Sequence, residues 1–196
     1  MQIFLPKIYY YINEYNLAEL SKLSNNINLI YRNYNNHNDI DTILKLKNFS
    51  KKTKRKLYIS NNIKLALNLK LNGIYIPSFN NKINYSYIYN KPKEFKIIGS
   101  AHNIREILIK EKQGCEEIFI SSIFKNLKSN KFLGVIRFNL LAKSSLNKII
   151  ALGGINVTNY KKLNSPKSIG FASISWAKKN GLSNLRPLYK DYTLTN

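Results

Sequence analysis

Two glycines follow an apolar run of the chain and are the clearest candidates for holding a phosphate group. Gly153 and Gly154 stand in the segment ALGGIN, after β-forming residues and before NVTNYKKL, which has the pattern of a helix. Glycine has no Cβ, so its backbone can approach a ligand closely, and N–H groups at a helix start bind phosphate well. For the dipeptide alone, the alternative is a tight turn without a ligand.

The segment GSAHN, at residues 99–103, directly precedes the helix-like sequence IREILIKEKQG. His102, one of two histidines in the chain, is therefore expected near a helix start. An imidazole in such a place can serve as acid or base, although a capping or packing histidine is the alternative. Ser100 can donate its hydroxyl to a phosphate or cap the helix.

A cation ends another predicted strand. The guanidinium of Arg32 can form a bidentate contact with a diphosphate, and a surface salt bridge is the alternative. The single cysteine, Cys115, excludes an internal disulfide and has no local group of cations, so a buried, unreactive thiol is expected.

Short β-rich runs alternate with helix-like segments along the chain. The eight predicted strands are residues 8–12, 28–32, 56–59, 73–76, 96–98, 117–120, 148–151 and 168–172. Such alternation predicts parallel strands joined by helices, and eight units favour a compact (β/α)8 TIM barrel over an open sheet. We expect a single domain over residues 1–196, with an irregular connection after the fourth strand.

The predicted barrel also predicts where a site lies, because barrel active sites form at the C-terminal ends of the strands. The residues at these positions are mainly small, polar or glycine, with the cation of Arg32 and the imidazole of His102 among them. This lining suits an anionic ligand with polar groups. It does not suit metal coordination or stacking on nucleic-acid bases.

The chain is strongly basic, with 32 Lys and Arg against 10 Asp and Glu and a net charge of +22. It is also rich in Lys, Asn, Ile and Tyr, which A/T-rich codons encode, so we attribute most of the charge to codon usage. The basic run at 51–56 is expected to be a solvated helix end.

No nucleic-acid motif is recognisable, and no apolar run approaches the roughly 18 residues of a membrane span. We therefore expect a cytoplasmic protein with neither nucleic acid nor membrane as a partner.

Taken in order, these segments resemble the thiamine phosphate synthase family, which includes the related thiazole tautomerases. The resemblance covers roughly residues 8–176 and is carried by LYISNNIKLALNLKLNGIYI, IIGSAHNIREI, GCEEIFISSIFKNLKSNKFLG, IIALGGINVTNYKKL and SIGFASIS. It implies a (β/α)8 barrel and a role in thiamine biosynthesis. The family's synthases join an aminopyrimidine diphosphate to a thiazole phosphate and release diphosphate, using Mg²⁺.

The resemblance also implies roles for particular residues. Arg32 and Ser100 match residues that contact the pyrimidine diphosphate, and Lys128 is the counterpart of a lysine in a phosphate loop. His102 matches the acid/base of the tautomerase branch. The thiazole phosphate site is matched by Gly153, Gly154, Ile174 and Ser175.

The chain departs from the family pattern in the second predicted strand and after the third and fourth. The usual Gln-Leu-Arg-x-Lys is Ile-Tyr-Arg-Asn-Tyr at 30–34, so only Arg32 remains. The two Mg²⁺-binding carboxylates are replaced by Asn61 and Asn80, whose oxygens are neutral, whereas Mg²⁺ prefers carboxylate. These changes indicate a divergent, compact branch.

The preferred function from sequence is thiamine phosphate synthase, acting on phosphorylated pyrimidine and thiazole molecules. Thiazole tautomerase is the first alternative, because it needs His102 but neither Mg²⁺ nor the diphosphate site. A non-catalytic relative that binds a phosphorylated ligand is the second. The oligomeric state is not predicted.

Overall fold

Eight parallel strands close into a barrel in the computed structural model, which describes residues 7–35, 39–83, 89–126, 130–156, 158–163 and 168–173. Each strand pairs with the next in the sequence, and β1 also pairs with β8 to close the ring. The strands are β1 (Lys7–Ile12), β2 (Ile27–Tyr31), β3 (Leu57–Ser60), β4 (Gly73–Ile76), β5 (Lys96–Ala101), β6 (Glu117–Ile120), β7 (Lys148–Leu152) and β8 (Ser168–Ala172). The predicted barrel is confirmed.

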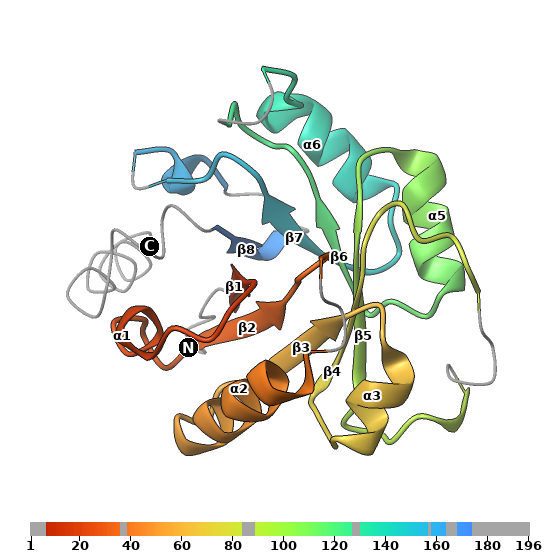
Figure 1. Cartoon of the computed structure of the whole chain (residues 1–196). Helices are drawn as coiled ribbons and strands as arrows, with labels where there is room; N and C mark the ends of the chain where they lie inside the picture. The colour runs from red at the N-terminus through yellow and green to blue at the C-terminus, as the bar shows by residue number, and fades with distance from the viewer. Residues whose placement is uncertain are drawn as a thin grey trace, which may run out of the picture.

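Helices lie around the outside of the strands (Figure 1). They are α1 (Leu17–Leu20), α2 (Ile40–Lys52), α3 (Ile63–Asn68), α5 (Ile104–Lys112), α6 (Gly134–Lys143) and the 3-10 helix η1 (Tyr160–Leu163). Four of them begin at an Asn or Asp whose side chain accepts a hydrogen bond from the backbone N–H three residues later: Asn16, Asp39, Asn62 and Asn103. The Asn-rich composition therefore supplies the N-caps of these helices.

Aromatic rings fill the inside of the barrel. The interior cluster consists of Tyr9, Tyr11, Ile30, Tyr58, Tyr75, Ile98, Phe119, Ile150 and Ala172. The ring centroid of Phe119 lies 4.9 Å from that of Tyr9 and 5.9 Å from that of Tyr75, both edge-on, which is a favourable arrangement for aromatic pairs. A second cluster fills the layer between strands and helices. The barrel is thus a packed core and not a pore.

The N-terminal end of the barrel contains a buried carboxylate, Glu117, whose side chain is 1% exposed. It accepts a hydrogen bond from the hydroxyl of Tyr9 at 2.5 Å, forms an ion pair with Lys7, and lies 3.9 Å from the ammonium of Lys96. We call these four residues the barrel base. Burial, then the neighbouring Tyr58 and Glu117, raise the pKa of Tyr9, so its hydroxyl stays protonated.

The connection after β4 is irregular where it is described, because residues 77–83 form no helix. Side chains of α5 and of the turn after it bind its backbone: the Lys110 ammonium donates to the carbonyl of Asn80 at 2.7 Å, and the Gln113 amide donates to that of Lys82 at 2.9 Å. Lys110 is completely buried. A buried cation therefore fixes the loop that follows β4 from outside the barrel wall.

Two details of the sequence-based expectations are corrected. The helix expected from NVTNYKKL is only the short η1, because the side chain of Asn156 accepts from the backbone of Thr158 and Asn159 and competes with helical hydrogen bonds. In the basic run at 51–56, α2 ends as expected, but Arg55 is buried and donates to the carbonyls of Leu23 and Ser24. That guanidinium has a structural role.

Within the described residues, none of the helices has the length and apolar character needed to cross a membrane. Cys115 is buried as expected, and burial raises the pKa of its thiol to about 12. The thiolate is therefore not formed at neutral pH, and this cysteine is a packing residue.

Candidate functional site

Arg32 lies at the C-terminal end of β2, among the residues that follow the eight strands and form what we call the mouth of the barrel. Its backbone N–H donates to the carbonyl of Ile12 at 2.7 Å, which holds it beside the end of β1. Its guanidinium carbon lies 4.5 Å from the ring centroid of Tyr11 and 5.5 Å from that of Tyr34. Arg32 pairs with no carboxylate among the described residues, so the surface salt bridge is not found there.

The hydroxyls of Tyr11 and Ser60 are buried, and neither forms a hydrogen bond of normal geometry with another described residue. The two residues are 6% and 5% exposed. Burial raises the pKa of Tyr11, so its hydroxyl is a neutral donor. Because a buried polar group normally finds a partner, these hydroxyls make the mouth a candidate place for a polar ligand.

Ser100 is buried near the end of β5. Its Oγ accepts a hydrogen bond from the hydroxyl of Tyr75 at 2.9 Å, and its own O–H remains available as a donor. It does not cap α5, since the side chain of Asn103 does so. The capping role considered for Ser100 is therefore wrong, and hydrogen bonding to a ligand stays a prediction.

The structure brings Asn61 and Asn80 together, but in a way that does not suit a metal ion. The Nδ2 of Asn80 donates to the Oδ1 of Asn61 at 2.9 Å, and the Oδ1 of Asn80 accepts from the backbone N–H of Lys82 at 3.0 Å. Both side-chain oxygens thus already accept hydrogen bonds, and the N–H group of Asn80 occupies the space between the two side chains. Within the described ranges, no three His, Cys, Asp or Glu side chains gather into a possible metal site. The donor set does not fit Mg²⁺, which prefers carboxylates and water.

His102 follows β5 and precedes the N-cap of α5. Its Nδ1 lies 2.9 Å from an Oε2 of Glu106, and its backbone N–H donates to the same oxygen at 2.8 Å. The imidazole is half-exposed. It is therefore placed at the rim of the mouth with one ring nitrogen engaged.

Gly153 and Gly154 both have positive φ, of 94° and 71°. A Cβ on Gly153 would lie 2.2 Å from the Oγ of Ser122, and one on Gly154 would lie 2.4 Å from the carbonyl oxygen of Lys125. The segment after β6 packs so closely against Gly153 and Gly154 that no other residue fits at either position. Both glycines are therefore explained by packing, whether or not a ligand binds there. With η1 so short, the helix-start contribution expected for a phosphate is also lost.

The ends of β7 and β8 do lie together. Leu152 pairs with Ala172, and the hydroxyl of Ser173 donates to the carbonyl of Ile155 at 2.7 Å. The remaining predicted contacts, Ile174, Ser175 and Lys128, lie outside the described residues, as do His37 and Trp176.

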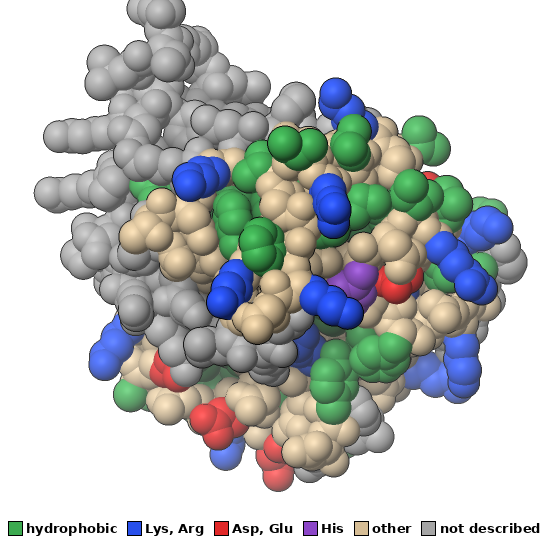
Figure 2. All heavy atoms as spheres, turned by 90° about the horizontal axis from the view of Figure 1, so that it is seen from above, with side chains coloured by type: hydrophobic (Ala, Val, Ile, Leu, Met, Phe, Trp, Pro, Cys, Tyr) green, Lys and Arg blue, Asp and Glu red, His purple; other side chains and the backbone are tan. Residues whose placement is uncertain are grey.

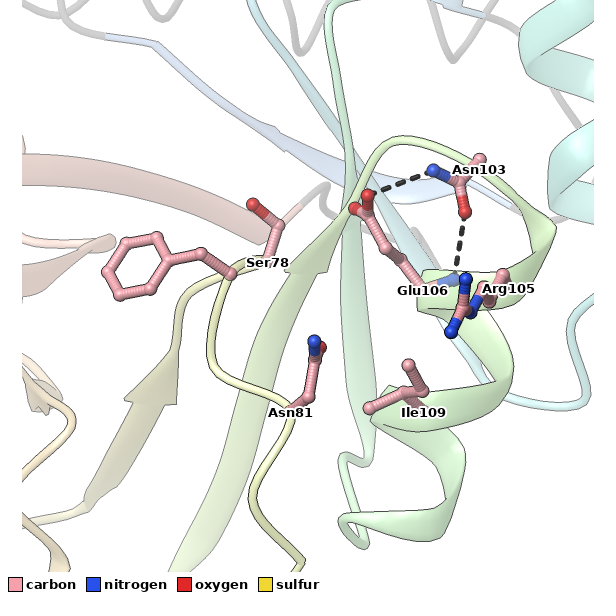
Figure 3. Close-up of a pocket in the computed structure, with 7 residues that line it drawn as sticks. Ser78, Asn81, Asn103, Arg105, Glu106 and Ile109 are labelled. Atoms are coloured by element: carbon pink, nitrogen blue, oxygen red, sulfur yellow. Dashed lines mark hydrogen bonds between the residues drawn. The ribbon is translucent and has the colours of Figure 1, made fainter.

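A pocket of about 300 Å³ lies between the loop after β4 and the start of α5 (Figure 3). It is lined by Ser78, Phe79, Asn81, Asn103, Arg105, Glu106 and Ile109. The ring of Phe79 also meets that of Tyr34 edge-on, with centroids 5.6 Å apart, so the loops after β2 and β4 touch there. Figure 2 shows Lys and Arg side chains spread across the face seen from above, without forming one patch.

Sequence reasoning missed Tyr11 and Glu106. Tyr11 stands two residues from Tyr9 in a strand, so alternation places both rings inside the barrel, but the sequence does not show that the Tyr11 hydroxyl lacks a partner. Glu106 completes the pattern Asn103-x-x-Glu106, a helix-start signal that also places a carboxylate four residues after His102.

The fold and the polar mouth define a class: a (β/α)8 barrel with a candidate site for an anionic ligand at the C-terminal ends of its strands. The profile of the family described as "Thiamine monophosphate synthase" matches residues 23–176, and the chain belongs to this family.

Individual relatives are distant. The thiamine-phosphate synthase of Methanococcus vannielii is 29% identical over 108 residues, which cover 54% of this chain and 52% of the relative. The matched stretch therefore spans about half the length of that protein.

Two solved structures show the same fold. The thiamine phosphate pyrophosphorylase of Pyrococcus furiosus has a TM-score of 0.74 at 16% identity, covering 95% of this chain and 96% of that one. The Bacteroides thetaiotaomicron enzyme of the same name has a TM-score of 0.57 at 15% identity, covering 92% and 88%.

Proposed function

We propose that this chain joins an aminopyrimidine diphosphate to a thiazole phosphate at the mouth of the barrel and releases diphosphate. The observation that carries the proposal is Arg32: a cation at the mouth of a barrel of this family, between two tyrosine rings, with no carboxylate partner among the described residues. Such a cation is suited to an anionic group, and forked contacts to phosphate oxygens are the strong ones for arginine.

In this reaction the C–O bond to the diphosphate breaks, and the electron pair leaves with the diphosphate. The thiazole nitrogen then attacks the pyrimidine cation. Negative charge grows on the leaving group, so groups that bind it more strongly as it leaves accelerate the step. Arg32 supplies the positive charge in this proposal, and the hydroxyls of Tyr11, Ser60 and Ser100 supply neutral donors.

Mg²⁺ is typical of the family, but Asn61 and Asn80 form a hydrogen bond to each other and do not fit it. We infer that Arg32 and the positive charge of the chain neutralise the diphosphate instead. Activity that requires Mg²⁺ and is lost in an Asn61→Ala variant would contradict this inference.

The proposed function is tested by incubating the purified protein with both precursors, with and without Mg²⁺. The assay measures thiamine phosphate and released diphosphate, which the proposed reaction forms in equal amounts. Formation of both without added metal supports the proposal, and their absence under both conditions contradicts it. Binding of thiamine phosphate without turnover would identify a non-catalytic member of the family.

Thiazole tautomerase is the second candidate, favoured by the contact between His102 and Glu106 and by the absence of carboxylates at Asn61 and Asn80. The replacement His102→Gln separates the two activities. Tautomerase activity depends on the imidazole and is expected to fall by at least a hundredfold, since general acid–base catalysis typically contributes 10²–10⁴-fold. Synthase activity is expected to fall much less.

A further inference from the structure

The carboxylate of Glu106 binds three donors at the start of α5, and one of them is the imidazole of His102. Its Oε2 lies 2.8 Å from the backbone nitrogen and 2.9 Å from the Nδ1 of His102. Its Oε1 accepts from the Nδ2 of Asn103 at 2.9 Å. Figure 3 shows Asn103 and Glu106 facing each other, joined also by the bond from the Glu106 backbone to the Asn103 side chain.

We propose that Glu106 is a positioning residue that holds neutral His102 in the tautomer with its proton on Nδ1. A carboxylate only accepts hydrogen bonds, so the 2.9 Å contact requires a proton on Nδ1. In the neutral ring, the lone pair is then on Nε2. The backbone N–H of His102 donates to the same carboxylate oxygen at 2.8 Å, which keeps that oxygen beside the ring.

This arrangement gives Nε2 the role of proton acceptor. It takes a proton from a carbon or heteroatom acid of the substrate, and the imidazolium formed keeps its Nδ1–H paired with the carboxylate of Glu106. The same Nε2–H then returns the proton to another atom of the substrate. The catalytic part of the inference rests on tautomerase activity, the second candidate function, whereas the tautomer is a property of the protein without substrate.

Helix capping alone would also explain a glutamate at this position. Asn103 offers a matched control, because its side chain caps α5 and does not touch the imidazole. Asn103→Ala removes the cap and the bond to Oε1 of Glu106, and leaves both bonds between Oε2 of Glu106 and His102. Glu106→Ala removes both of these bonds.

The test is the ¹⁵N spectrum of histidine-labelled protein in a His37→Gln background, where His102 is the one histidine left of two. Spectra are recorded at a pH high enough that the imidazole signals no longer change. The expected result is a proton on Nδ1 in the parent protein and in Asn103→Ala, and a shift of the proton to Nε2 in Glu106→Ala. Tautomerase turnover in Glu106→Ala is expected to fall by roughly tenfold or more, with Asn103→Ala close to the parent.

A proton on Nε2 in the parent protein would overturn the proposal. So would an unchanged tautomer in Glu106→Ala, or the same shift in Asn103→Ala. Because the spectrum is read without substrate, a lack of turnover counts against the proposed activity and not against the position of Glu106.

Discussion

The two ends of the barrel interior treat buried polar groups in opposite ways. At the barrel base, Glu117 is surrounded by Lys7, Tyr9 and Lys96, so a buried negative charge is met by cations and a hydroxyl donor. At the mouth, Arg32 faces aromatic rings and Tyr11 has no hydrogen-bond partner among the described residues. Within the part of the chain that the structure describes, the polar groups of the base have partners, and two buried hydroxyls of the mouth do not.

This difference indicates that one end of the barrel stabilises the fold and that the other end is suited to bind a ligand. Polar groups satisfied within the protein stabilise the folded state, whereas unsatisfied ones cost stability and persist where a ligand completes them. In (β/α)8 barrels the N-terminal face is generally tied to stability and the C-terminal face to function. Substitutions at the base should therefore change the free energy of unfolding, and those at the mouth should change ligand affinity.

The largest expected effect is at the base. Glu117→Ala leaves Tyr9 without its acceptor and Lys7 without its partner, and is expected to lower the free energy of unfolding by about 4 kcal/mol. Urea unfolding measures this change. A loss below 1 kcal/mol would show that the base does not stabilise the fold as described.

Lys110 extends the comparison to a buried cation outside the barrel wall. Burial lowers its pKa from 10.5 to about 8, so between these values the unfolded chain binds a proton that the folded chain does not. The contribution of Lys110 to the free energy of unfolding therefore rises with pH from about 8 to 10.5. Below pH 8, Lys110 is charged in both states, and the whole cost of burying its charge lowers the free energy of unfolding. We expect the free energy of unfolding of the parent protein, minus that of Lys110→Met, to rise by up to about 3 kcal/mol over this interval. A flat difference would mean that Lys110 is not desolvated.

At the mouth, Arg32→Ala is expected to weaken binding of a phosphorylated ligand by roughly 10- to 100-fold, because a hydrogen bond to a charged group contributes about 1.5–3 kcal/mol. The free energy of unfolding should change little. Calorimetric titration at two salt concentrations measures the affinity. Equal affinity in the variant would remove Arg32 from the site.

The smallest effects are expected for the buried hydroxyls of Tyr11 and Ser60. Tyr11→Phe and Ser60→Ala each remove a buried polar group that has no partner among the described residues, so stability should stay the same or rise by up to about 1 kcal/mol. Ligand affinity should fall several-fold in the same variants. Clear destabilisation would show that these hydroxyls are already satisfied in the folded protein.

The barrel was predictable because its strands are buried on both faces and appear as short apolar, β-branched and aromatic runs at regular spacing. The helix expected after Gly154 was not found, since side-chain hydrogen bonds of Asn156 are invisible to a periodicity argument. The sequence also located Arg32, Ser100 and His102 at strand ends. It did not reveal the Asn61–Asn80 hydrogen bond or the partner of His102, because side-chain pairing depends on loop conformation and not on spacing alone.

The central claim is that the mouth, and not the base, binds a phosphorylated ligand. Calorimetric titration of thiamine phosphate into the parent protein, Arg32→Ala and Glu117→Ala tests it most directly, at a temperature where circular dichroism shows all three folded. We predict binding by the parent and Glu117→Ala with similar affinity, and a loss of tenfold or more in Arg32→Ala. Equal binding by the parent and Arg32→Ala, or a loss confined to Glu117→Ala, would contradict the account.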